Sequence, residues 1–237
     1  MARFGLDEVE PTEARVPNVM LLDNSGSMGF STTAPDGSTY EKIELLNEGL
    51  ELFKEEVEND YQTKKAVDLS LFTFGGTVDQ VQEFTPIQQW TPPELQDPSG
   101  GTPMCNAIVE GTDHLQDYTE EVDDEALPRN RALMWVLTDG EPDMRRGSDD
   151  WDLAQEVIEE GTKDNHFLFY AVGIGDDANM DKLEDLISVA EDGNAMAFQL
   201  DKGQFKEFFR IVSETSKHQS KEATSDEDAD DAVEGPE

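Results

Sequence analysis

Several oxygen-bearing side chains follow apolar segments of the chain, where folding can bring them to one edge of a sheet. Asp23, Ser25 and Ser27 come directly after the apolar run of residues 16–22. Gly26 lies between the two serines and lets the backbone turn sharply. One carboxylate and two hydroxyls from a single loop form an all-oxygen site, which suits a hard cation such as Mg²⁺. The loop therefore predicts a metal site.

Two further segments offer ligands that would complete this shell. The apolar run of residues 132–138 ends at Asp139, and Thr102 follows two glycines just before a predicted helix. The carboxyl ends of strands in an open α/β sheet are where such folds bind ligands. An octahedral ion held there keeps several waters, so one coordination position can accept an outside ligand.

The elements that must position these residues alternate between strands and helices. Apolar or alternating runs predict strands at residues 16–22, 66–74, 78–84, 132–138, 166–172 and 195–200. Helical spacing predicts helices at residues 40–59, 103–118, 151–162, 180–190 and 203–216. This order predicts an α/β fold: a doubly wound, mostly parallel six-stranded sheet with helices on both faces. The strand at 78–84 is expected to be its one antiparallel edge strand.

The three motif segments, in this order and at this spacing, resemble the metal-ion-dependent adhesion site of von Willebrand factor A (VWA) domains. That site has the pattern DxSxS, then Thr, then Asp, and the resemblance extends over residues 18–217. The chain most resembles the stand-alone cytoplasmic VWA proteins associated with tellurite resistance. The resemblance implies a Rossmann-like fold and a Mg²⁺ site, with Mn²⁺ or Ca²⁺ as alternative ions. The implied metal ligands are Asp23, Ser25, Ser27, Thr102 and Asp139.

The same resemblance implies a function in recognition. A partner protein would supply an Asp or Glu carboxylate to the metal, in a stress-response or defence-type assembly. Residues around the metal would add selectivity, and the expected rim consists of Asn24, Met28, Phe30, Met104, Glu141 and Pro142. The loops at residues 30–38 and 143–150 flank this rim.

Three other interpretations remain open from the residues alone. The motifs can be helix caps and turns without a metal, or a metal can serve stability only. A phosphoester hydrolase of the haloacid dehalogenase type would use Asp23 as nucleophile. That mechanism needs a second Asp where Ser25 stands. It also needs a lysine aimed at the phosphate, and we expect no lysine near Asp23, Thr102 or Asp139. We therefore expect no catalytic residues and no enzyme activity.

The formal net charge is −38, and the acidic residues are spread along the chain. Self-repulsion of this size destabilises a compact state unless salt screens it, which indicates a halophilic, haloarchaeal cytoplasm. The chain has no basic patch that would neutralise phosphates, so nucleic acid is not an expected partner.

The expected organisation is an N-terminal extension at residues 1–15, the VWA domain at 16–217 and a disordered acidic tail at 218–237. The tail has eight acidic residues and one lysine. The first residues lack an apolar signal core, and no run approaches the ~20 apolar residues of a membrane span, so a cytoplasmic location without a membrane is expected. Cys105 is the only cysteine and is expected in the core beneath its helix.

Overall fold

A computed structural model describes residues 14–33, 37–61, 63–139, 143, 145–175 and 178–200. The expected N-terminal extension up to residue 13, the closing helix at 203–216 and the acidic tail at 218–237 lie outside these described residues.

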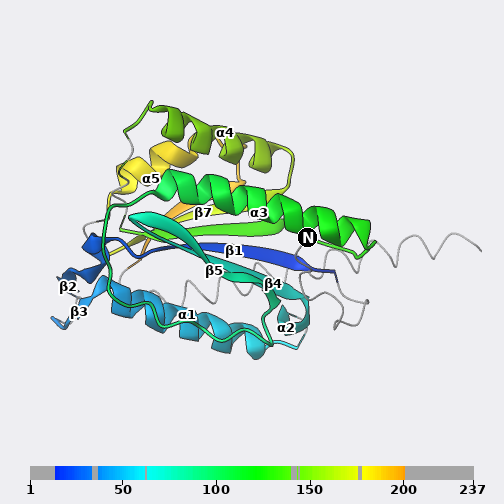
Figure 1. Cartoon of the computed structure of the whole chain (residues 1–237), viewed down its shortest axis with the longest axis horizontal. Coiled ribbons are helices and arrows are strands. Elements are labelled where there is room, and N and C mark those ends of the chain that lie inside the picture. Colours follow the sequence, from blue (N-terminus) through cyan, green and yellow to red (C-terminus); the bar gives the residue numbers. More distant parts are fainter. Residues whose placement is uncertain are drawn as a thin grey trace, which may run out of the picture.

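A six-stranded sheet forms the centre of the molecule (Figure 1). Its strands, in sequence order, are β1 (Val16–Asp23), β4 (Val67–Gly75), β5 (Thr77–Pro86), β6 (Ala132–Thr138), β7 (Phe167–Ile174) and β8 (Ala195–Leu200). The spatial order is β5-β4-β1-β6-β7-β8, in which β5 is antiparallel to β4 and the other neighbours are parallel. The predicted fold class, including the antiparallel edge strand, is therefore confirmed.

Helices cover both faces of this sheet (Figure 1). The helix α1 (Lys42–Glu58) and the short α2 (Thr63–Ala66) lie on one side, and α3 (Met104–Asp124), α4 (Asp149–Lys163) and α5 (Met180–Ile187) lie on the other. Both faces of the parallel strands are consequently buried, as in other α/β sheets.

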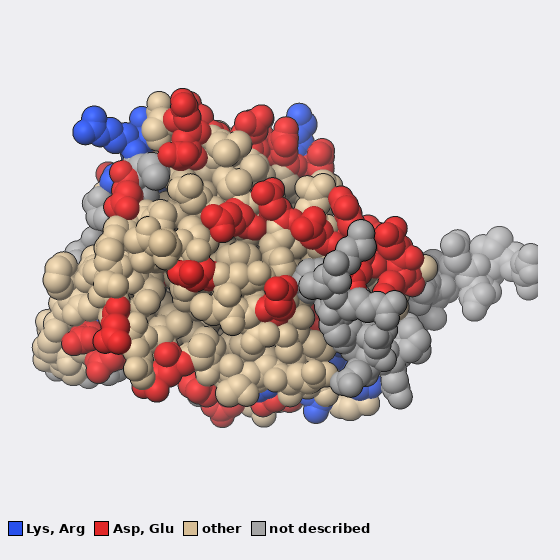
Figure 2. Space-filling view, viewed as in Figure 1, with Lys and Arg blue, Asp and Glu red and all other residues tan. Residues whose placement is uncertain are grey.

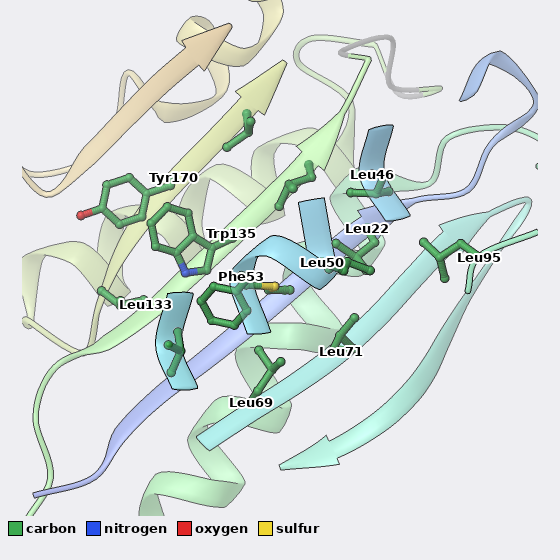
Figure 3. Packing of buried hydrophobic residues seen from close by; sticks show 14 of the residues in the cluster. Leu22, Leu46, Leu50, Phe53, Leu69, Leu71, Leu95, Leu133, Trp135 and Tyr170 are labelled. Atoms are coloured by element: carbon green, nitrogen blue, oxygen red, sulfur yellow. The ribbon is translucent and has the colours of Figure 1, made fainter. Parts of the chain in front are cut away.

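The apolar stripe of α1 packs on one face of the sheet (Figure 3). Leu46, Leu50 and Phe53 of this helix belong to the same buried cluster as Leu22 and Leu71. On the opposite face, α3, α4 and α5 bury a second cluster that includes Val19, Leu21 and Cys105. Alternate residues of β1 thus enter opposite cores, as the two-residue period of a strand requires. The prediction that Cys105 lies in the core is confirmed.

Several local details differ from the sequence prediction. The segment expected to be a long loop contains two short antiparallel strands, β2 (Ser31–Thr33) and β3 (Thr39–Glu41), which pair in a separate sheet. The helix α3 extends to Asp124, beyond its predicted end at residue 118, because Val122 continues its buried stripe. Pro103, expected in the first turn, is instead the N-cap of α3.

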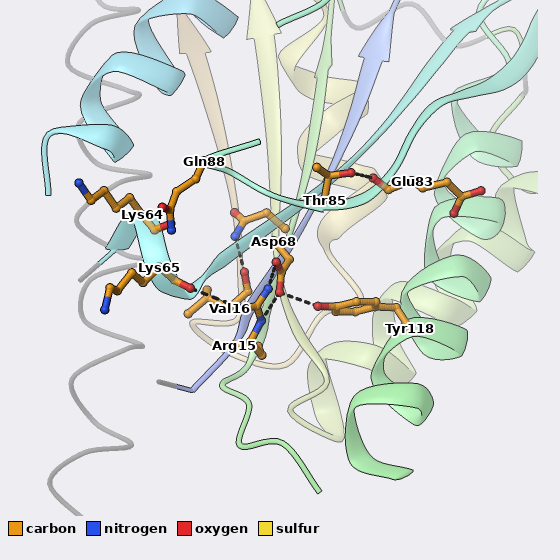
Figure 4. Close-up of polar contacts among 10 residues, drawn as sticks. Arg15, Val16, Lys64, Lys65, Asp68, Glu83, Thr85, Gln88 and Tyr118 are labelled. Atoms are coloured by element: carbon orange, nitrogen blue, oxygen red, sulfur yellow. Dashed lines mark hydrogen bonds and ion pairs between the residues drawn. The ribbon is translucent and has the colours of Figure 1, made fainter. Parts of the chain in front are cut away.

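A buried polar network lies at the end of the sheet where β1 begins (Figure 4). The guanidinium of Arg15 binds both carboxylate oxygens of Asp68, and the hydroxyl of Tyr118 donates a hydrogen bond of 2.5 Å to Oδ2 of Asp68. The alternation of residues 66–74 would place Asp68 on a polar face, but its side chain is fully enclosed. The network therefore links the residue before β1 to β4 and α3, at the opposite end of β1 from Asp23.

Within the described residues, no helix is both long enough and apolar enough to cross a membrane.

Candidate metal centre

Asp23 and Asp139 come together at the carboxyl edge of the sheet. Asp23 is the last residue of β1, and Asp139 directly follows the neighbouring parallel strand β6. The chain leaves β1 towards α1 on one face and leaves β6 towards α4 on the other (Figure 1). The two carboxylates therefore lie at the topological switch point, where open α/β sheets bind ligands.

Both oxygens of the Asp23 carboxylate are held by hydrogen bonds. The backbone N–H of Ser25 donates to Oδ1 over 2.8 Å, and the hydroxyl of Thr138 donates to Oδ2 over 2.5 Å. Burial and, to a smaller extent, the charge of nearby Asp139 raise the pKa of Asp23 to about 6, although these hydrogen bonds lower it. Two carboxylates in one buried site repel each other, and a cation placed between them would relieve that repulsion.

The two serines of the first motif lie beside Asp23. Ser25 is buried, and its hydroxyl oxygen is 3.1 Å from that of Ser27. Residues Gly26–Gly29 form a single turn of 3-10 helix, in which Gly26 provides the turn between the two serines. Asp23, Ser25 and Ser27 therefore lie together at the end of β1.

Backbone hydrogen bonds join this loop to the segment that contains Thr102. The N–H of Gly26 donates to the carbonyl of Gly100 over 3.1 Å, and the N–H of Ser99 donates to the carbonyl of Asn24 over 3.0 Å. Thr102, two residues after Gly100, is buried. The second motif is thus fixed against the first, although no direct contact joins the Thr102 hydroxyl to Ser25 or Ser27 in the interactions described.

Asp143 holds the backbone of Thr102. The N–H of Thr102 donates to Oδ2 of Asp143 over 2.7 Å, and the N–H of Asp143 donates back to the Thr102 carbonyl over 3.1 Å. A Cβ atom at Gly101 would lie only 2.1 Å from Oδ2 of Asp143. The second glycine of the motif is therefore needed to admit this carboxylate.

Asp139 has one oxygen without a partner and one oxygen beside a lysine. Its Oδ1 is buried and receives no hydrogen bond from any described residue. Its Oδ2 lies 3.4 Å from the ammonium nitrogen of Lys42, and both side chains are almost fully buried. The expectation that no lysine lies near these motifs is therefore wrong, because α1 begins at Lys42 and brings it to Asp139 from 97 residues away in the sequence.

The donor set suits a hard cation. Buried carboxylate oxygens are normally paired, so the unpartnered Oδ1 of Asp139 is consistent with an ion as its missing partner. No described group of three or more His, Cys, Asp or Glu side chains is arranged to hold a metal. An ion at this edge would consequently depend on serine and threonine hydroxyls, which magnesium accepts and softer metals do not favour.

Part of the predicted rim is not at the surface. Met28 and Met104 are fully buried in the two cores, because the turn after Asp23 and the first turn of α3 both face inward. Phe30 is 67% exposed and does lie on the surface. Glu141 and Pro142 lie outside the described residues.

Sequence reasoning missed Lys42, Thr138 and Asp143. Thr138 ends an apolar strand one residue before Asp139, and this position was a usable signal. Lys42 and Asp143 gave no such signal, because each reaches the site through the tertiary fold.

Comparison with known proteins identifies the fold. No protein-family model matches the sequence, and no curated protein matches it significantly. The PilB minor pilin from Streptococcus sanguinis superposes with a TM-score of 0.63 and 13% identity, over 88% of this chain and 63% of that chain. This chain thus spans less than two thirds of the length of PilB.

Two shorter structures match over nearly their whole lengths. The VWA domain of SpRpn10 gives a TM-score of 0.55 and 13% identity, over 83% of this chain and 94% of that one. The vWF domain of the type V pili tip protein Mfa5 from Porphyromonas gingivalis gives 0.58 and 10% identity, over 88% and 97%. With its six-stranded, mostly parallel sheet and flanking helices, the chain has the Rossmann-like α/β fold of VWA domains.

Proposed function

We propose that this protein is a metal-dependent protein-interaction domain. Mg²⁺ would be held at the carboxyl edge of the sheet by Asp23, Ser25, Ser27, Thr102 and Asp139, with Mn²⁺ or Ca²⁺ as substitutes. The bound ion would supply a strong, short-range attraction for one oxygen ligand. An Asp or Glu side chain of a partner protein would provide that ligand.

One observation carries this proposal. Among the described residues, Oδ1 of Asp139 is buried without a hydrogen-bond partner, and the buried carboxylate of Asp23 is near enough to act on it by charge. A buried carboxylate oxygen without a hydrogen bond is unfavourable even where the other oxygen lies beside an ammonium, so the site is suited to a cation.

The similar structures support a role in assembly. PilB is a minor pilin and Mfa5 is a type V pili tip protein, so this fold occurs in proteins of pili, which are assemblies. The proposed assembly here is of the stress-response or defence type, in a halophilic cytoplasm. Neither a membrane nor a nucleic acid is part of the proposal.

The negative surface charge makes the binding of an acidic partner depend on the salt concentration. The net charge is −38, and Figure 2 shows acidic residues scattered over the visible face, with Lys and Arg only near its margins. An acidic partner would be repelled at long range in dilute salt. Molar salt shortens the Debye length to about 3 Å, which removes this repulsion and leaves the metal–oxygen contact.

A phosphoester hydrolase is the second candidate, and Lys42 is the observation that favours it. Its ammonium is a cation beside Asp139, where no lysine was expected from the sequence. However, Ser25 still occupies the position where that mechanism needs a general acid. Turnover of p-nitrophenyl phosphate with Mg²⁺, lost in Asp23→Asn, would favour this candidate; we expect no turnover.

The proposal is tested by calorimetric titration of Mg²⁺ into metal-stripped protein in molar KCl. We expect one saturable site, lost in both Asp23→Ala and Asp139→Ala. Asp124→Ala is the matched control, because it removes one exposed carboxylate at the far end of α3 and should bind Mg²⁺ like the wild type. Mg²⁺ binding that persists in both Asp23→Ala and Asp139→Ala would mean that the motifs are only helix caps and turns.

Partner recognition needs its own experiment. Immobilised wild-type protein should retain a partner with Mg²⁺ and release it with EDTA, and the Asp23→Ala protein should retain none. A partner retained equally by both proteins would contradict the metal-dependent mechanism while leaving the metal site itself in place.

A further inference from the structure

Phe30 is a large apolar side chain that stays in solvent beside the candidate metal centre. It is 67% exposed, the highest value among the exposed large hydrophobic residues that the structure describes, the others being Tyr61, Val81, Leu153 and Met196. It directly follows the turn that contains Ser27, so it lies on the loop that provides three of the proposed metal ligands. Single apolar residues are common on protein surfaces. The position of Phe30 therefore decides whether its exposure has a role.

Backbone hydrogen bonds fix Phe30 to both sides of the site. Its N–H donates to the carbonyl of Ser27 over 3.0 Å and so ends the 3-10 turn. Its carbonyl accepts the N–H of Lys42 over 3.3 Å, and the ammonium nitrogen of Lys42 lies 3.4 Å from Oδ2 of Asp139. The next residue, Ser31, begins the pair of β2 and β3, which lies at this end of the molecule (Figure 1). The ring is thus carried by a held backbone, bonded to one proposed ligand and one lysine away from another.

Tyr61 provides a comparison at the other end of α1. It follows the end of this helix and is 64% exposed. The ammonium nitrogens of Lys64 and Lys65 lie 5.4 and 4.7 Å from its ring centroid, within the range of cation–π contacts. Among the described residues, Phe30 has no such ring or cation contact. The two rings are almost equally exposed, and only that of Tyr61 has a described partner within the chain.

A carboxylate ligand alone would give the proposed metal site little selectivity. This chain itself has 55 Asp and Glu residues, and the other proteins of a halophilic cytoplasm would be acidic for the same physical reason. Many carboxylates would therefore compete for the metal. At 1 M salt the Debye length is about 3 Å, so charges farther from the metal add little discrimination. Apolar burial does not depend on charge, so it can supply selectivity under these conditions.

We infer that Phe30 is the specificity-determining contact of this site, and that the ligand is an acidic residue flanked in sequence by an apolar residue. This inference rests on the proposed function and defines the partner segment more closely. The partner's carboxylate would bind the metal, and the neighbouring apolar side chain would pack on the ring of Phe30. A segment that offers both groups at the right separation would be selected over an isolated carboxylate.

The test uses four peptides with Mn²⁺-loaded protein in molar KCl. They are acetyl-Gly-Asp-Gly-amide, acetyl-Leu-Asp-Gly-amide, acetyl-Gly-Asp-Leu-amide and acetyl-Leu-Asp-Leu-amide, which vary the apolar neighbour on each side of one carboxylate. Bound Mn²⁺ accelerates the relaxation of the peptide protons, and titration of this effect gives each dissociation constant. At least one leucine peptide should bind about tenfold more tightly than the glycine peptide, because contact with the ring buries apolar surface of both side chains.

Three variants assign this preference to a residue. Phe30→Ser should lose the tenfold preference, while its calorimetric Mg²⁺ affinity and its affinity for the glycine peptide stay at the wild-type values. Phe30→Leu keeps a smaller apolar side chain and should retain part of the preference. Tyr61→Ser is the matched control, because it removes an almost equally exposed ring from the other end of α1. It should bind all four peptides like the wild type.

The outcomes separate this inference from the proposed function. Equal affinities for the four peptides, or no binding of any of them to the metal-loaded protein, would overturn the role of Phe30 and leave the metal site in place. A preference for leucine that persists in Phe30→Ser, or that Tyr61→Ser loses equally, would overturn it as well. A wild-type protein without saturable metal binding would overturn the proposed function itself, and this inference with it.

Discussion

The hydroxyl of Thr138 donates a hydrogen bond of 2.5 Å to Oδ2 of Asp23, and this bond joins the ends of two neighbouring strands. Because Ser25 holds the other oxygen, the carboxylate is oriented before any ion arrives. A ligand fixed in advance loses less conformational entropy on binding, which favours affinity. Thr138 is therefore expected to position Asp23 rather than to contact the ion.

Thr138→Val removes this hydrogen bond and keeps the shape of the side chain. A net hydrogen bond contributes about 1 kcal/mol, so Mg²⁺ affinity should fall about fivefold. Thr112→Val is the control, since its hydroxyl donates within α3 to the carbonyl of Ile108. Calorimetry on both variants checks the prediction, and equal affinities would mean that Thr138 does not position Asp23.

The sheet and its order of elements were predictable because apolar runs and turns leave a local signal. The strands at 16–22 and 132–138 match β1 and β6 within a residue at each end. Asp23 and Asp139 could be placed at one edge for the same reason, since parallel neighbours end together. These parts of the fold follow from short-range pattern alone.

The remaining parts depend on tertiary contacts that leave no local pattern. Asp68 alternates with apolar residues and so resembles a solvent-facing position, yet Arg15 and Tyr118 enclose it. Lys42 resembles a solvated residue at the start of a helix, yet it reaches Asp139. In both cases the partner lies 50 or more residues away in the sequence, so the buried charge could not be recognised before its partner was placed.

Metal binding should weaken in acid because of Asp23. Burial raises the pKa of this carboxyl to about 6 in the metal-free protein, and an ion must displace its proton. Mg²⁺ affinity should be constant above pH ~7 and should fall about tenfold per pH unit below pH ~6. Titrations across this range check it, and a constant affinity down to pH ~5 would contradict it.

The raised pKa of Asp23 has the opposite effect on the stability of the metal-free protein, because acid favours its folded state. The folded state holds the Asp23 proton more tightly than the unfolded chain does, where the pKa is near 3.8. The stabilising contribution, at most about 3 kcal/mol, is present below pH ~4 and is lost as the pH rises through 6. The difference in unfolding free energy between wild type and Asp23→Asn should therefore depend on pH within this window only.

Salt should stabilise the protein strongly. With a net charge of −38, the folded state repels itself, and the repulsion falls as the Debye length shortens from about 10 Å at 0.1 M to 3 Å at 1 M salt. The midpoint of thermal unfolding should rise steadily over this range, in NaCl as well as KCl. A midpoint independent of salt would contradict the expectation of a halophilic protein.

The buried network at the far end of β1 should be essential to stability without affecting the metal. Burial lowers the pKa of Arg15, but the adjoining Asp68 carboxylate outweighs this effect and raises the pKa above its ordinary value. Arg15→Met would leave Asp68 charged, buried and without its cation. Loss of one partner from a buried pair destabilises by about 3–5 kcal/mol, which urea unfolding in molar KCl would measure.

Two comparisons make that measurement specific to the buried pair. The double variant Arg15→Met/Asp68→Leu removes both charges and should recover most of the lost stability, because an apolar pair needs no counter-ion. Arg129→Met breaks the exposed pair with Asp123 and should lose at most about 1 kcal/mol. Equal losses in Arg15→Met and Arg129→Met would contradict the prediction. Calorimetric Mg²⁺ affinity should remain unchanged in all folded variants, since Arg15 and Asp68 pair near the start of the strand that Asp23 ends.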